Sequence, residues 1–99
     1  MNKHTKQLLA RANKLIRAAE QRIRESRADN EPHPSIATTR CFYNNAWGLF
    51  NLAGNYAGIA YCREKLEETG LGWNELAEQQ RLGYITARID AWRIGMKNE

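Results

Sequence analysis

The side chains that could do metal or nucleophilic chemistry in this sequence are two histidines and two cysteines, His4, His33, Cys41 and Cys62. None of them stands at the close Cys-x-x-Cys or His-x-x-x-His spacing that metal sites use. Nucleophilic catalysis needs a serine or cysteine beside a histidine and an orienting acid, and no G-x-S-x-G motif occurs. The sequence therefore predicts no metal, no cofactor and no enzymatic activity.

Positive charge is the next candidate feature, and it is concentrated at the start of the chain. Residues 1–29 carry eight Lys or Arg and three Asp or Glu, a net charge of +5. The other residues carry seven and eight, a net charge of −1, so the total of +4 arises in the first segment. A basic segment favours an anionic partner or an acidic protein surface, and the plain alternative is a solvated helix face.

The basic segment has the apolar pattern of an amphipathic helix over about 6–28. Apolar side chains recur at steps of three and four, from Leu8 through Leu15 to Ile23, and Thr5 is a suitable N-cap. The basic residues occupy the other faces of this helix. Those predicted to contact a partner are Lys6, Arg11, Lys14, Arg17, Arg22, Arg24 and Arg27.

The stretch between the two cysteines, CFYNNAWGLFNLAGNYAGIAYC, has no charged residue but contains four asparagines and three glycines. The pattern predicts one long helix over about 36–69 that ends at Gly70. Glycine inside a helix costs about 1 kcal/mol, so a kink or a close approach of another backbone is expected. Gly54 and Gly58 have the spacing of close helix packing. One polar or small stripe either packs internally or faces a partner: Asn44, Gly48, Asn51, Asn55 and Gly58.

The cysteines and the asparagines also bear on location. In one continuous helix Cys41 and Cys62 would lie about 30 Å apart, too far for a disulfide. With no signal peptide visible at the N-terminus, they are predicted to be reduced thiols in a cytoplasm. The four asparagines make membrane insertion of the stretch unfavourable.

Two connections and one more helix complete the chain. Residues 29–35, which include Pro32, His33 and Pro34, are predicted to be a linker, and residues 70–73 a turn. The helix over about 74–96 has a wide apolar arc, which packs on two neighbours or keeps one side for a partner. The residues of this arc predicted to contact a partner are Leu82, Ile85, Ile89 and Trp92.

Residues 75–95, ELAEQQRLGYITARIDAWRIG, resemble a repressor-type helix-turn-helix over about a fifth of the chain. Residues 75–77 match the first helix of that family, and Ile89 and Trp92 match core positions of the second. The family's turn glycine follows the alanine of the first helix by four residues, whereas Gly83 follows by six. The resemblance implies a DNA-binding regulator, but no recognition surface rich in amides and hydroxyls follows the turn.

Together these patterns predict an all-α fold, a small three-helix bundle with a long, uncharged central helix, as one domain over residues 1–99. The predicted function is that of a small non-enzymatic protein that modulates or inhibits a larger macromolecule. One form is a phage- or mobile-element-type inhibitor of a host nucleic-acid enzyme. The alternative is a DNA-binding transcriptional regulator that uses the basic helix or residues 75–95. The predicted partner is a protein, nucleic acid could bind the basic helix, and a homodimer is compatible with both readings.

Overall fold

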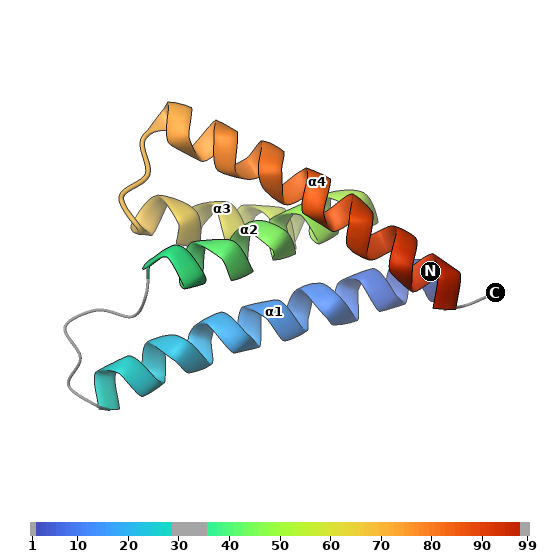
Figure 1. The fold of residues 1–99 in the computed structure, drawn as a ribbon, viewed down its shortest axis with the longest axis horizontal. Coiled ribbons are helices and arrows are strands. Elements are labelled where there is room, and N and C mark those ends of the chain that lie inside the picture. Colours follow the sequence, from blue (N-terminus) through green and yellow to red (C-terminus); the bar gives the residue numbers. More distant parts are fainter. Residues whose placement is uncertain (1, 29–35, 98–99) are drawn as a thin grey trace.

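The structure is a computed structural model that describes residues 2–28 and 36–97, and this part of the chain contains four helices and no strand (Figure 1). The helices are α1 (Lys3–Ala28), α2 (Ile36–Ala53), α3 (Tyr56–Glu68) and α4 (Trp73–Lys97). The all-α prediction is confirmed. The three-helix arrangement is wrong, because the helix predicted over 36–69 consists of α2 and α3. The predicted linker over 29–35 lies outside the described residues.

The break between α2 and α3 comes from two adjacent residues, Gly54 and Asn55. Gly54 has a φ of 70°, a left-handed conformation that glycine adopts without strain and that ends α2. Asn55 then caps α3, because its Oδ1 accepts a hydrogen bond from the amide of Gly58 at 2.8 Å. The expected kink is therefore a full reversal, and α2 and α3 form an antiparallel hairpin (Figure 1). Gly54 makes no close helix contact, whereas a Cβ on Gly58 would meet the Phe50 ring of α2 at 2.4 Å, so the predicted close packing is confirmed at Gly58 and wrong at Gly54.

Helix α2 is the central element, because α1, α3 and α4 all pack against it. Helix α1 runs antiparallel to α2 on one side, and α4 crosses α2 obliquely on the other (Figure 1). Helices α1 and α4 converge at the end of the molecule that holds both termini, where Arg11 Nε lies 3.8 Å from a carboxylate oxygen of Asp90. The helices therefore enclose a core on both sides of α2.

The core consists of two clusters of buried apolar side chains around α2. They form because α1 presents Leu8, Ala12, Leu15 and Ala19 at steps of three and four on one face. The first cluster contains Leu8, Ala12, Leu15, Ala46, Leu49, Phe50, Cys62 and Ala87. The second contains Ala19, Tyr43, Leu66 and Leu76. The helix predicted over about 6–28 is confirmed, but it begins at Lys3. Its N-cap is Asn2 and not the predicted Thr5, because Asn2 Oδ1 accepts a hydrogen bond from the Thr5 amide.

Helices α2 and α4 cross at a contact between small residues. A Cβ on Gly48 would lie 2.4 Å from the carbonyl oxygen of Gly83, and a Cβ on Gly83 would lie 2.4 Å from the carbonyl oxygen of Asn44. Ala87, one turn after Gly83, is fully buried at the same crossing. The two backbones can approach this closely because neither glycine has a side chain. The close approach expected of the glycines therefore occurs at Gly48.

The end of α3 is fixed to the start of α2 by Arg40. The Arg40 guanidinium donates from Nε to Thr69 Oγ1 and from Nη2 to the Thr69 carbonyl oxygen, both at 2.9 Å. Thr69 Oγ1 in turn donates to the Leu66 carbonyl oxygen at 2.6 Å. A cation at a helix C-terminus is also favoured by the helix dipole. This clamp holds the open ends of the α2–α3 hairpin together.

We expect Arg40→Met to lower the free energy of unfolding by about 1.5–3 kcal/mol, because two charge-assisted hydrogen bonds are lost. Urea denaturation followed by circular dichroism measures this change. The matched control is Arg81→Met, whose guanidinium forms an exposed ion pair with Glu78 at 2.6 Å. Its loss should change stability much less, because water and salt screen an exposed ion pair. Equal effects of the two substitutions would contradict the clamp.

Residues 75–95 form part of one continuous helix, α4, and contain no turn. The helix-turn-helix arrangement that the resemblance implied is therefore wrong. Gly83, the residue compared with the turn glycine of that family, lies inside the helix and is buried against α2. In the described ranges 2–28 and 36–97, none of the helices combines the length and apolar character that crossing a membrane requires.

Candidate partner-binding surfaces

Four residues of the predicted basic face point into solvent from α1. The side chains of Lys6, Lys14, Arg17 and Arg24 are all exposed. Their spacing places them on the side of α1 opposite the buried apolar residues, since a helix turns by about 100° per residue. They therefore form a continuous positive surface that faces away from the bundle.

Arg11 and Arg22, also predicted as partner contacts, lie on the flank of α1 and interact within the protein. Arg11 pairs with Asp90 of α4, and the Arg22 guanidinium lies 5.9 Å from the centre of the Phe42 ring. Both interactions attach α1 to its neighbours. The side chain of Arg27 lies outside the described part of the chain. The basic face thus consists of four outward residues, and two others contribute to packing.

The polar stripe of the uncharged segment does not form one surface. Asn44 and Gly48 are buried at the crossing with α4, whereas Asn51 is exposed. Asn55 is the N-cap of α3, and Gly58 faces the ring of Phe50, which a Cβ would meet at 2.4 Å. Packing and capping therefore account for four of the five stripe residues.

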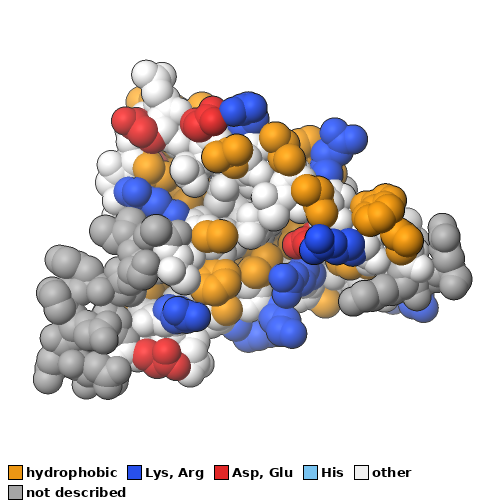
Figure 2. Space-filling model, viewed as in Figure 1, with side chains coloured by type: hydrophobic (Ala, Val, Ile, Leu, Met, Phe, Trp, Pro, Cys, Tyr) orange, Lys and Arg blue, Asp and Glu red, His pale blue; other side chains and the backbone are white. Residues whose placement is uncertain are grey.

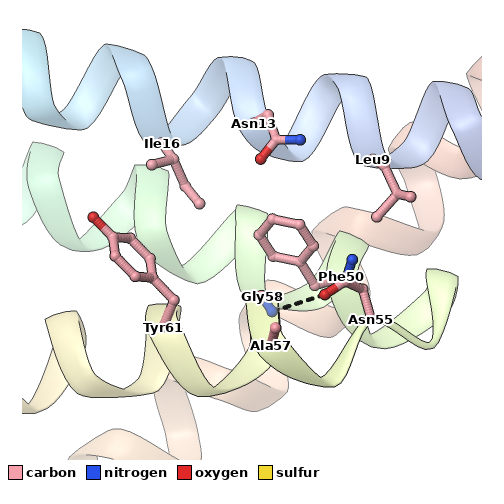
Figure 3. A pocket seen from close by; sticks show the side chains of 8 residues that line it. All are labelled: Leu9, Asn13, Ile16, Phe50, Asn55, Ala57, Gly58 and Tyr61. Atoms are coloured by element: carbon pink, nitrogen blue, oxygen red, sulfur yellow. Dashed lines mark hydrogen bonds between the residues drawn. The ribbon is translucent and has the colours of Figure 1, made fainter.

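A hollow of about 360 Å³ lies between α1 and α3 (Figure 3). Its lining is mainly apolar, and the Phe50 ring of α2 lies between the other two helices there. The amides of Asn13 and Asn55 are its polar groups, together with the hydroxyl of Tyr61. That hydroxyl donates a hydrogen bond to Glu20 at 2.5 Å, and this bond raises the pKa of Tyr61. The hydroxyl therefore stays neutral at ordinary pH, and the hollow offers shape but no reactive group.

Large apolar side chains are exposed along one side of α4, and we call this set the outer face. It consists of Leu82, Ile85, Ile89, Trp92 and Met96, each between 44% and 65% exposed. Figure 2 shows apolar side chains in a row along α4, with Lys or Arg side chains on both edges of the row. Four of these residues were predicted as contacts, and Met96 continues their steps of three and four.

The opposite side of α4 carries the smaller residues that pack against α2. Gly83 and Ala87 are buried there because the close crossing leaves no room for larger side chains. Leu76 is buried on this side and Ile94 packs there too, yet α4 leaves five other large apolar residues exposed, against the usual preference. Exposed apolar residues gathered in one patch are typical of a binding surface. The fold does not use the outer face, so it is the strongest candidate for a functional site.

The cysteines lie in very different surroundings. Cys41 is exposed and Cys62 is fully buried, and both are free thiols. Burial raises the pKa of Cys62 to about 12, so its thiol is neutral and unreactive at ordinary pH. Cys41 and Cys62 lie on two different helices, α2 and α3, so the separation of about 30 Å predicted for one continuous helix does not apply. Among residues 2–28 and 36–97, no group of three His, Cys, Asp or Glu side chains could hold a metal ion.

The chain was compared with protein-family models, with curated proteins and with solved structures, and none of them matches it.

Proposed function

We propose that this chain is a non-enzymatic binding protein that modulates or inhibits a larger macromolecular partner by covering part of its surface. The observation that carries the proposal is the outer face of α4, where five large apolar residues are exposed together, on the side away from the crossing with α2 at Gly83 and Ala87. An apolar face of this length is costly in water unless a partner covers it. The proposal places the protein in a cytoplasm, where free thiols such as Cys41 persist.

A specific form of the proposal is a phage- or mobile-element-type inhibitor of a host nucleic-acid enzyme. Its support is the outward basic face of α1, formed by Lys6, Lys14, Arg17 and Arg24. Such a surface can occupy the acidic or DNA-facing parts of an enzyme by charge complementarity. The partner would then be a protein that contacts α4 through apolar side chains and α1 through charges.

The test is affinity capture from the cells that encode the chain, with the purified chain and the variant Ile85→Glu/Ile89→Glu as baits. The two isoleucines are nearly half exposed, so the variant should fold, and an unchanged circular dichroism spectrum checks this. We expect the variant to lose the captured partner, because two charges would enter an apolar contact. A partner retained equally by both baits would contradict the proposal.

The variant Arg17→Glu/Arg24→Glu tests the basic face in the same experiment. We expect it to abolish the complex with a nucleic-acid enzyme and to leave the helical circular dichroism unchanged, because both side chains are exposed. If this variant still captured the partner, the basic face would not be part of the binding surface, and only the outer face of α4 would remain as the proposed contact.

The second candidate function is DNA binding through the basic face of α1, and the same four exposed cations favour it. Phosphate contacts by Lys and Arg give an affinity that falls steeply with salt. A gel shift with duplex DNA over a salt series separates the two functions. A protein-directed modulator should bind duplex weakly or not at all. Tight, salt-sensitive binding that Arg17→Glu/Arg24→Glu removes would favour the regulator.

A further inference from the structure

The spacing of the outer face specifies the shape of what covers it. Its five residues follow one another at steps of three, four, three and four, from Leu82 to Met96. This alternation is the seam of a two-helix contact, in which the side chains of one helix enter spaces between those of the other. An open hollow of about 470 Å³ lies on this face, lined by Ile85, Arg88, Ile89 and Trp92. The natural occupant of such a face is another amphipathic helix.

The charges beside the seam indicate which charge the occupant should carry. Arg88 and Arg93 stand on opposite edges of the outer face, at the positions that flank the apolar residues of a helix pair. Both are exposed, and neither forms an ion pair with another described residue. The nearby acid Asp90 faces Arg11 of α1, and Glu78 is paired with Arg81. The edges of the outer face are thus positive and uncompensated.

These charges argue against a second copy of the same chain as the occupant. In a parallel pair of α4 helices, Arg88 of one copy would face Arg93 of the other. In an antiparallel pair, the edge that carries Arg88 would lie along the same edge of the other copy, and the two Arg93 edges would meet likewise. Both arrangements bring positively charged edges together beside the seam, which is unfavourable. A helix with acidic residues beside its apolar stripe forms attractive pairs at both edges.

We propose that the outer face of α4 is a docking site for an acidic amphipathic helix of a partner protein. This inference rests on the proposed function and names the chemistry of the partner. Apolar side chains of the partner enter the seam between Leu82 and Met96, and its Asp or Glu residues contact Arg88 and Arg93. The basic face of α1 lies on another helix and does not take part.

The experiment uses the full chain and two designed helical peptides with Leu at the seam positions. One peptide carries Glu at all flanking positions, and the other carries Lys. Titration followed by the fluorescence of a labelled peptide gives the two dissociation constants. We expect the Glu peptide to bind at least about tenfold more tightly than the Lys peptide at low salt. The variant Arg88→Glu/Arg93→Glu should reverse this preference, and the control Arg17→Glu/Arg24→Glu should keep it.

Equal affinities for the two peptides, or no binding of either, would overturn the inference. So would a dimer in sedimentation that Ile85→Glu/Ile89→Glu dissolves, since it would identify a second copy as the occupant. Binding of single-stranded oligonucleotides that depends on Arg88 and Arg93 would overturn it as well. The proposed function is tested separately: a partner captured through α4 that is not an acidic helix would refute this inference alone.

Discussion

The Gly83→Ala substitution is expected to lower the free energy of unfolding by at least about 2 kcal/mol, although it replaces glycine inside a helix. The added Cβ would lie 2.4 Å from the carbonyl oxygen of Asn44 and 2.7 Å from the Asn44 side chain. A backbone oxygen in the middle of α2 cannot move aside alone, so the two helices must separate. Separation would disturb both the crossing and the buried Ala87 beside it. This cost exceeds the gain of about 1 kcal/mol from better helix propensity.

The matched control is Gly95→Ala in the same helix. A Cβ at Gly95 would have its nearest neighbour at 3.9 Å, the ring of His4, which is an ordinary contact. The substitution should therefore stabilise the protein by about 0.5–1 kcal/mol, the propensity difference alone. Thermal and urea unfolding of the two variants measure the contrast. If Gly83→Ala were neutral or stabilising, the α2–α4 crossing described here would be wrong.

Alkaline pH is expected to unfold the protein because neutral acids are buried in its core. Burial raises the pKa of Cys62 from 9.0 to about 12 and contributes most to raising that of Tyr43 to about 12. In the unfolded chain both groups lose their protons at lower pH than in the folded protein. Their contribution to stability is therefore fully present below about pH 9 and is lost as the pH rises toward 12. For the fully buried Cys62 alone, the loss is on the order of 4 kcal/mol.

The variant Cys62→Ala tests this prediction. It removes the titrating thiol and leaves a small side chain in the core, so stability at neutral pH should fall slightly. Above pH 9 the free energy of unfolding should decline less steeply than in the wild type, because one fewer proton is involved. Cys41→Ala, on an exposed thiol, is the matched control and should keep the wild-type decline. Denaturant titrations at a series of pH values give the slope of the free energy of unfolding against pH. Identical slopes in all three proteins would contradict a contribution of the Cys62 thiol to the alkaline loss of stability.

The division between α2 and α3 shows what sequence patterns could predict here and what they could not. The glycines indicated a kink, but three of them stood at interior positions and propensity alone could not choose among them. Gly54 breaks the helix because Asn55 follows it as an N-cap and Arg40 fixes the far end of α3 to the start of α2. The Arg40–Thr69 contact joins residues 29 positions apart. Local sequence carries no sign of such a contact, so the reversal was missed.

For helix α4, the sequence predicted the candidate contact residues but not the side that packs against the bundle. Its wide apolar arc and its candidate contact residues were predicted from spacing, and the structure leaves those residues exposed. The sequence could not tell which side of the arc packs, because large apolar side chains ordinarily point inward. The deciding residue was Gly83, which lies inside the helix predicted over about 74–96 and does not match the turn glycine of the helix-turn-helix family. Its true place, against the backbone of Asn44, depends on a residue of another helix.

The separation of small and large residues on α4 has an evolutionary consequence. Folding constrains Gly48 and Gly83, whereas the identities of Ile85, Ile89 and Trp92 matter little to the packed core. Mutations at the exposed positions can accumulate without loss of the fold, so the partner of the proposed docking site could change while the bundle is retained. Under the proposed function, one helix of 25 residues would carry two independent selective pressures. A chain organised in this way can follow a rapidly changing partner at little cost to its own stability.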